Sequence, residues 1–231
     1  MEKIVLLKSM LELQYKLNVV TCGEKWFDGM TSEERVINWR RYMRMELAEL
    51  IDSSPMFKHW KDLGGAVKWN NIRMEVVDVW HFLMSEALPH HTIEEILVMC
   101  ERHLAYPAVG ELELDYFDVI DIADELTEHT FDRDHSAEAR MMFSFFKLLA
   151  AVGMSFEDLY KQYIVKNTLN TFRQNNGYKE DTYVKVIDGE EDNVHIMGIV
   201  NLDPTLTPEA LYAKYEEFYI IHTTEEETTT E

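Results

Sequence analysis

Two short acidic pairs constrain this chain more than any other feature. The first is Glu46 and Glu49 in the stretch MELAELI, and the second is Glu75 and Asp78 in IRMEVVDVW. Each pair is spaced i, i+3, which places both carboxylates on one face of a helix, one turn apart. Apolar residues surround both pairs. The pattern therefore predicts two amphipathic helices that carry their acids beside a core.

The negative charge of carboxylates in such a position needs to be neutralised. A carboxylate close to a core is costly unless its charge is neutralised, and four carboxylates together raise one another's pKa values. Mg²⁺ would answer both problems because it takes oxygen ligands and shares its coordination shell with substrate phosphates. The alternative interpretation, a solvated helix face, stays open at this point, since one E-x-x-E pair alone has that meaning more often.

Composition limits the class of protein. The chain has 231 residues and a net charge of −21, from 43 acidic and 22 basic residues. We therefore expect one main domain and no nonspecific binding to nucleic acid or anionic membrane, although a nucleotide substrate remains compatible if Mg²⁺ neutralises its phosphates. The two cysteines form no disulfide framework. No signal pattern or apolar run of about 20 residues is visible, so we expect a cytoplasmic protein without a membrane span.

Periodicity and capping signals predict a mainly helical chain. The expected helices cover residues 3–20, about 32–52, 70–88, 92–104, 111–129, 136–153, 156–174 and 207–222. Weak alternation within 180–206, around Asp188-Gly189, predicts a short hairpin. We expect residues 1–222 to form a single domain and the polar, acidic residues 223–231 to form a disordered tail.

Several polar and aromatic residues have more than one interpretation. Gln14 and Asn18 are spaced i, i+4 on the first helix and, taken alone, are interpreted as surface polarity. Trp60, in an aromatic-rich stretch, belongs either to the core or to a surface that stacks on a base. His81 lies one turn beyond Asp78, where a lone histidine is more often structural than a ligand. Magnesium in any case prefers oxygen.

A third acidic stretch is interpreted as a solvated face. Residues 111–129 place several acids roughly along one stripe, while apolar residues lie towards another side. The acids are Asp115, Asp118, Asp121, Glu125 and Glu128.

Cations and amides gather in residues 166–179, which read KNTLNTFRQNNGYK. Lys166, Asn170 and Arg173 fall at i, i+4 and i+7 on one helix face, with Asn167 beside them. Arginine offers a fixed fork and lysine a mobile point charge for phosphate. The alternative, basic residues that suit the dipole at a helix C-terminus, explains Arg173 and Lys179 but not the two asparagines.

These motifs resemble a known family. E-x-x-E followed by E-x-x-D on helices resembles the all-α nucleoside triphosphate pyrophosphatases, which include the MazG-type enzymes and the dimeric dUTPases. The stretch 166–179 is similar to the C-terminal motif of the dimeric dUTPases, and the similarity runs in order from about residue 3 to residue 185. Asp181 departs from the glycine that the family often has at that position.

The resemblance implies an all-α helical bundle that works as a homodimer. It implies Mg²⁺-dependent hydrolysis of dUTP and dUDP to dUMP, with release of pyrophosphate or phosphate and more than one ion per site. This activity limits uracil in DNA and supplies dUMP for dTMP synthesis. Two alternatives stay open: a relative that prefers dCTP or a modified nucleotide, and a helical dimer that binds a nucleotide without hydrolysis.

The resemblance also implies roles for individual residues. Glu46, Glu49, Glu75 and Asp78 would ligate the metal, and we expect Glu49 to orient the attacking water and take its proton. The substrate would be held by three sets of residues: Gln14, Asn18 and Trp60 around the uracil; His81, Phe82 and Asn167 at the deoxyribose; and Lys166, Arg173, Tyr178 and Lys179 at the phosphates. Asn170 joins the last set by its place on the same helix face.

Overall fold

The structure is a computed structural model that describes residues 2–60, 66–110, 113–203 and 205–224. Its α-helices are α1 (Glu2–Cys22), α2 (Trp39–Asp52), α3 (Trp69–Ala87), α4 (Ile93–Glu101), α5 (Tyr116–His129), α6 (Ala137–Ala151), α7 (Phe156–Asn175), α8 (Asp192–Leu202) and α9 (Pro208–Thr224). Two 3-10 helices, η1 (Glu24–Asp28) and η2 (Pro55–Phe57), and two antiparallel strands, β1 (Val186–Ile187) and β2 (Glu190–Glu191), complete the described elements. The predicted all-α class is confirmed.

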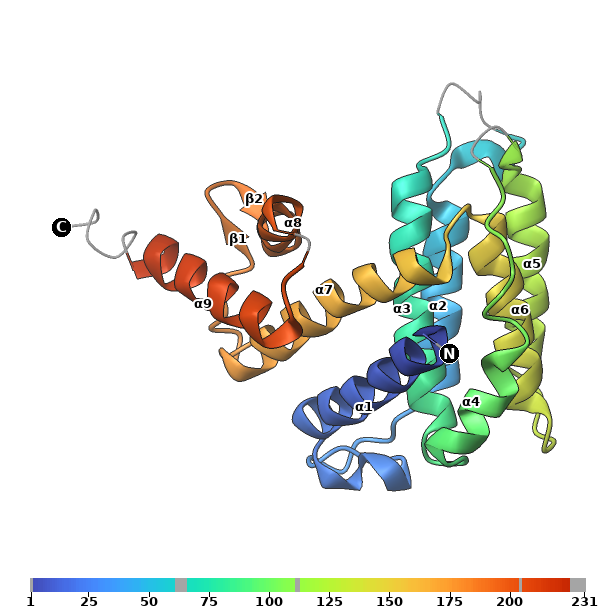
Figure 1. Cartoon of the computed structure of the whole chain (residues 1–231), viewed down its shortest axis with the longest axis horizontal. Coiled ribbons are helices and arrows are strands. Elements are labelled where there is room, and N and C mark those ends of the chain that lie inside the picture. The colour runs from blue at the N-terminus through green and yellow to red at the C-terminus, as the bar shows by residue number, and fades with distance from the viewer. Residues whose placement is uncertain (1, 61–65, 111–112, 204, 225–231) are drawn as a thin grey trace.

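Four helices form the body of the molecule (Figure 1). Helix α2 packs on α3, α3 on α6, α6 on α5 and α5 on α2, which closes a bundle. Its core is strongly aromatic: Trp80 of α3 stacks on Phe145 of α6 with ring centroids 4.7 Å apart. Helices α1 and α7 pack on each other and on α3, so three helices meet along one side of the bundle.

A second, smaller core lies at the far end of α7. Leu169 and Phe172 of α7 are buried there together with Ile196 of α8 and Tyr215 of α9. In Figure 1 α7 runs from the bundle to the lobe formed by α8, α9 and the hairpin. One helix therefore contributes to both hydrophobic cores.

The capping signals locate several helix ends correctly. Thr92 with Glu95, and Ser155 with Asp158, form reciprocal capping boxes at the starts of α4 and α7. Gly177 adopts φ +86° after α7, the left-handed conformation that glycine tolerates at a helix end.

The predicted start of α2 near residue 32 was wrong. The helix begins at Trp39 because the Asn38 side chain accepts a hydrogen bond from the backbone N–H of Arg41, 2.9 Å away. Upstream, Glu34 has φ +61°, which a right-handed helix does not allow. In the same way α5 begins at Tyr116, where the Asp115 side chain accepts from the Phe117 N–H.

The predicted hairpin is confirmed only in part. The two strands pair across Asp188 and Gly189, but each has two residues. The apolar residues Val194, Ile196 and Ile199 lie in α8 instead of a strand. Ile196 and Ile199, spaced i, i+3, share a helix face, while Val194 is 50% exposed on another side.

Two expectations concern stretches that lie partly outside the described ranges. The aromatic-rich stretch 56–70 is described only as far as residue 60 and again from 66, and of the predicted tail only residues 223 and 224 are described, as the end of α9.

No described helix by itself has the length and apolar character needed to cross a bilayer. Only α6 and α7 together meet that test, and they are bent by 101° at their junction.

Candidate active site

Three of the four predicted metal ligands come together between α2 and α3. Carboxylate oxygens of Glu46, Glu75 and Asp78 all lie within 4.8 Å of one another, and each side chain is only partly exposed. The grouping follows from the packing of α2 against α3, because the i, i+3 spacing turns each acid towards the partner helix.

The electrostatics of this group calls for a cation. Burial, followed by repulsion from the neighbouring acids, raises the pKa of Glu46 to about 7. The pKa of Glu75 also rises to about 7, mainly through burial and then through the charges of Asp78 and Glu49. Acids of this kind are destabilised in their charged form until something neutralises them. A donor set made entirely of carboxylate oxygens fits Mg²⁺.

Glu49 occupies a different position from the other three acids. It lies one turn further along α2 and is exposed, outside the closest group. Its charge nevertheless helps to raise the pKa values of Glu46 and Glu75, so it lies near them. An exposed carboxylate at the edge of a metal-ligand group suits contact with a water molecule and substrate.

Helix α7 brings positive charge to the acids. Lys166 Nζ lies 2.8 Å from Asp78 Oδ2. Burial raises the pKa of Asp78, and the charges of Lys166 and, less strongly, Arg173 oppose that rise. The ion pair therefore joins residues that are 88 positions apart in the sequence.

The amides of α1 are buried, and their interpretation as surface polarity was wrong. Gln14 and Asn18 are each 3% exposed and lie on the same helix face as Leu7 and Leu11. Gln14 Nε2 donates to Asn18 Oδ1 at 2.9 Å, and the Nε2 and Nδ2 groups of the two residues each lie 3.0 Å from Ser85 Oγ of α3. The three side chains form a closed polar group inside the core.

A second layer of hydrogen bonds extends this network to α7. Tyr163 Oη lies 3.1 Å from Gln14 Oε1 and 3.0 Å from the Met10 carbonyl oxygen, and it accepts from Asn167 Nδ2 at 3.0 Å. The His81 ring stacks on the Tyr163 ring with centroids 4.5 Å apart. We call the buried polar side chains of Gln14, Asn18, His81, Ser85, Tyr163 and Asn167 the amide network.

The network leaves one acceptor unused. Burial lowers the pKa of His81 to about 3, so its ring is neutral and carries a single proton. His81 Nδ1 lies 2.8 Å from Gln14 Oε1, which only accepts, so the proton is on Nδ1. Nε2 is then a buried acceptor with no hydrogen-bond partner among the described residues. It can accept a hydrogen bond from a hydroxyl or N–H group.

Two predicted substrate residues lie apart from the amide network. Trp60 is 65% exposed and packs edge-on against Phe57 and His59, in the connection between α2 and α3. This connection is at the opposite end of α3 from Ser85, about 24 Å away along the helix. Phe82 stacks on Trp39, with ring centroids 6.1 Å apart, on the side of α3 that faces α2.

The remaining residues that were predicted to bind phosphate lie in the C-terminal half of α7 or directly after it. Arg173 Nη1 donates to Asn170 Oδ1 at 3.2 Å, and the guanidinium lies 5.7 Å from the centre of the Tyr178 ring. Tyr178 is 45% exposed, and Lys179 is exposed as well. Arg173 also binds Asp192, a residue that the sequence analysis did not select.

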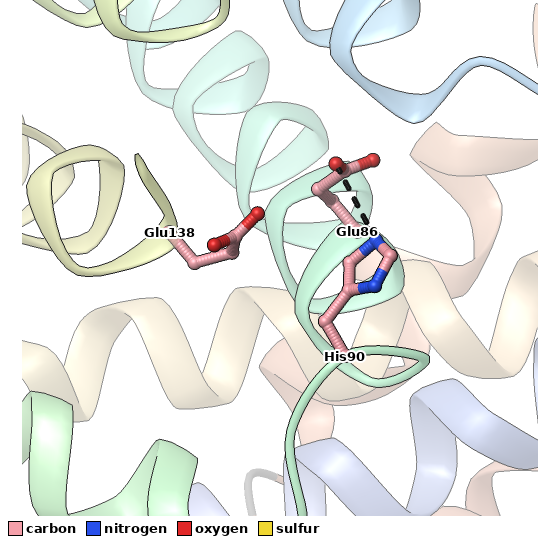
Figure 2. Close-up of side chains that lie close together, drawn as sticks. All are labelled: Glu86, His90 and Glu138. Atoms are coloured by element: carbon pink, nitrogen blue, oxygen red, sulfur yellow. Dashed lines mark ion pairs between the residues drawn. The ribbon is translucent and has the colours of Figure 1, made fainter. Parts of the chain in front are cut away.

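A second group of acids and histidine lies elsewhere (Figure 2). Glu86 of α3, His90 just after α3 and Glu138 of α6 bring ligand atoms within 4.8 Å of one another. Arg40 already bridges this group: its Nε and Nη2 atoms lie 2.5 Å from Glu86 Oε1 and Glu138 Oε1. A divalent ion would lie next to this nearly buried guanidinium, so the group is better explained as an ion-pair network that joins α2, α3 and α6.

The acidic stripe of α5 is partly paired. Glu125 accepts hydrogen bonds from Ser144 and Lys147 of α6, at 2.7 and 2.5 Å. Within the described residues, the groups that meet the geometric test for a metal ion do not include this stripe.

Sequence reasoning missed three residues of the site: Ser85, Tyr163 and Asp192. A hydroxyl on an apolar helix face gives no signal by itself, and Ser85 and Tyr163 become meaningful only when α1 packs on α3 and α7. One signal was present, because Ser85 follows His81 at i, i+4 and so shares its face. Asp192 lies in a stretch that was interpreted as part of a hairpin.

Grouped carboxylates on paired helices, with a lysine beside them and buried amides below, define a helical protein of the nucleotide-hydrolase type. A scan against protein-family models matches the family described as dUTPase over residues 6–178, and the chain belongs to that family. Its activity is therefore the hydrolysis of dUTP. A search of curated proteins finds no match to this chain.

Proposed function

We propose that this dUTPase works with Mg²⁺ held by Glu46, Glu75 and Asp78, together with Glu49, and that more than one ion binds. The observation that carries the proposal is the cluster of three carboxylates between α2 and α3, two of which have pKa values of about 7 because burial and then the neighbouring acids disfavour their charged form. When bound, magnesium neutralises phosphate charge and acidifies water.

The roles of the protein groups follow from their positions. Glu49, exposed at the edge of the cluster, orients the attacking water and takes its proton. Lys166, which faces Asp78, and Arg173 stabilise negative charge on the phosphates as the bond breaks. Tyr178 and Lys179, both exposed after α7, and Asn170 complete the phosphate side.

Base choice depends on which way the buried amides point. Cytosine and uracil differ by exchange of donor and acceptor at N3 and at the exocyclic position 4. An amide selects between them only if it cannot rotate. The Gln14 amide is fixed, because Oε1 faces His81 and Tyr163 while Nε2 faces Asn18 and Ser85. The resemblance supports a uracil site at Gln14 and Asn18, with the free His81 Nε2 and Asn167 facing the sugar. The Gln14 amide then exchanges some of these internal hydrogen bonds for bonds to the base.

Entry of the nucleotide requires movement. Gln14 and Asn18 are each 3% exposed and His81 is 5% exposed, so a base reaches them only when the surrounding helices separate. Since α1, α3 and α7 meet at the amide network, we propose that these helices part on binding. Binding of a non-hydrolysable dUTP analogue should then change hydrogen exchange in α1 beyond the change that Mg²⁺ alone causes.

The resemblance to dimeric dUTPases supports a homodimer, with dUDP as a second substrate. The two free, buried cysteines suit the reducing cytoplasm. Light scattering of the purified protein tests the proposed homodimer, because a monomeric mass would contradict it.

The decisive experiment is product analysis with a panel of deoxynucleotides, with Mg²⁺ and with a chelator, in ¹⁸O-labelled water. We expect dUMP and pyrophosphate from dUTP, dUMP and phosphate from dUDP, and almost no product without the metal. Equal turnover of dCTP would contradict the proposed base selection, and full activity in the chelator would contradict the metal site.

A further inference from the structure

A fully buried carboxylate lies beyond the region that matches the family model. The match ends at residue 178, and Asp192 is the first residue of α8. Asp192 is 0% exposed and is not a member of the acidic group of Glu46, Glu75 and Asp78. Such a residue must have strong partners, because an unpaired buried carboxylate is very costly.

The partner of Asp192 is an arginine of the phosphate side. Arg173 Nε and Nη2 lie 2.7 Å from Asp192 Oδ2 and Oδ1, which is a two-point fork in which one edge of the guanidinium meets both carboxylate oxygens. The Tyr183 hydroxyl donates to Asp192 Oδ2 at 2.9 Å, and the Asn193 backbone N–H donates to Oδ1 at 2.9 Å. Asp192 therefore has a fixed orientation of its own.

The fork leaves part of the guanidinium free. Of the five N–H groups of Arg173, Asp192 accepts from two and Asn170 from one. Two N–H groups, one on each Nη atom, remain without a hydrogen-bond acceptor among the described residues. The side chain is 14% exposed, and its charge acts on Asp78. A guanidinium held on one edge with its other N–H groups available is prepared to bind phosphate oxygens without loss of side-chain entropy on binding.

We propose that Asp192 is a positioning residue for the phosphate-binding Arg173, and that the C-terminal lobe of α8 and α9 serves the active site in this way. The inference rests on the proposed role of Arg173 at the phosphates. Asp192 acts only through Arg173, so its removal weakens the grip on the phosphates and leaves base selection unchanged.

A double-mutant cycle tests the inference, with kcat and KM measured for dUTP in the full chain. Asp192→Asn should raise KM for dUTP with a smaller change in kcat, and lower kcat/KM about tenfold. Arg173→Gln should lower kcat/KM at least as much. In the Arg173→Gln background, the further change Asp192→Asn should have almost no effect, because the group that Asp192 positions is already gone.

Two further variants separate positioning from folding. Tyr183→Phe removes only the hydroxyl that holds Asp192 Oδ2, keeps the charge pair, and should give a smaller rise in KM, about threefold. Glu190→Gln removes the same charge from an exposed position two residues away and should match the wild type. Thermal unfolding of each variant shows whether it is folded. The ratio of dUTP to dCTP turnover should be the same in all of them.

The outcomes distinguish the two proposals. If Arg173→Gln has wild-type kinetics, the phosphate role of Arg173 is wrong, and the inference falls with it. If Arg173→Gln is impaired but Asp192→Asn lowers kcat/KM equally in both backgrounds, or if folded Asp192→Asn and Tyr183→Phe both have wild-type KM, Asp192 supports only the fold and the inference is wrong.

Discussion

Lys166 Nζ lies 2.8 Å from Asp78 Oδ2, so a protein cation already occupies one side of the proposed metal site. The pair joins α7 to α3 and is partly exposed. The lysine therefore has two opposing effects: it competes with a bound metal for Asp78, and it supplies positive charge to the phosphates.

These effects predict that Lys166→Met strengthens the binding of Mg²⁺ but slows the hydrolysis of dUTP. Loss of the competing charge should strengthen Mg²⁺ binding without nucleotide, by about 1 kcal/mol or roughly fivefold, while hydrolysis of dUTP falls. Calorimetric titration of Mg²⁺ and steady-state kinetics measure the two quantities. Lys161→Met, on an exposed turn of the same helix, is the matched control. Weaker Mg²⁺ binding in Lys166→Met would contradict the competition.

Glu49→Gln should nearly abolish turnover. The amide keeps the shape of the side chain but cannot take a proton from water, and general-base groups contribute about 10²- to 10⁴-fold to rate. Because Glu49 is exposed, the fold should be unaffected, and thermal unfolding should match that of the control Glu101→Gln on α4. Activity within a factor of three of the wild type would remove Glu49 from its proposed role.

Glu75→Gln should stabilise the protein in the absence of metal. The substitution removes one of the charges that repel one another between α2 and α3, and we expect the free energy of unfolding to rise by about 1 kcal/mol in a chelator. In the wild type, Mg²⁺ should raise the melting temperature, whereas the variant should lose most of that rise. A variant that is less stable than the wild type in the chelator would show that repulsion is not significant.

The lowered pKa of His81 makes a predictable contribution to the pH dependence of stability. Its pKa is about 3 in the folded protein, against about 6.5 unfolded. Above pH 6.5 the ring is neutral in both states and has no effect. Below that pH the unfolded chain binds a proton that the folded protein does not, so the contribution of His81 lowers the free energy of unfolding by about 1 kcal/mol between pH 6 and 5. The raised pKa values of Glu46 and Glu75 contribute with the opposite sign over the same range.

Urea unfolding at several pH values measures the slope of the free energy of unfolding against pH. His81→Asn lacks this contribution, so when the pH is lowered from 6 to 5 its free energy of unfolding should end about 1 kcal/mol higher, relative to its value at pH 6, than that of the wild type. Its stability at pH 7 should be lower. His135→Asn, at an exposed position, should keep the wild-type slope. Identical slopes in all three proteins would show that His81 is protonated as readily in the folded state as in the unfolded chain.

Arg40→Gln should be the most destabilising of these changes. Arg40 binds Glu86 and Glu138 and also the Asp132 carbonyl oxygen. Removing one partner of a buried ion pair leaves the others uncompensated, which costs about 3 to 5 kcal/mol. Arg41→Gln, at the neighbouring exposed position, should cost less than about 0.5 kcal/mol. Equal losses in chemical denaturation would contradict the assigned network.

The grouping of Glu46, Glu75 and Asp78 could be predicted from the sequence because the spacing of residues on a helix determines which side chains share a face. An i, i+3 pair beside an apolar stripe lies close to the neighbouring helix, and the structure places Glu46 next to Glu75 and Asp78, whereas Glu49 is exposed outside that group. The capping boxes at Thr92 and Ser155 were readable for the same reason, since the partners lie three residues apart.

Other features depend on contacts between distant segments, which no local pattern records. The burial of Gln14 follows from Ser85 and Tyr163, which are far from it in sequence. The fork between Arg173 and Asp192 required α8 to be recognised as a helix. The place of Trp60 at the far end of α3 from the buried amides could not be read from its neighbours either.

Because a single helix carries both Asn167 and Arg173, the separation between the residue proposed to meet the sugar and the arginine proposed to meet the phosphates is set by helix pitch. Six residues at 1.5 Å each give about 9 Å along the axis. The helix α7 therefore fixes the spacing between these groups along the nucleotide. Inserting or deleting one residue between its two ends would turn the far groups by about 100°, so the count of residues along this segment matters as much as their chemical identity.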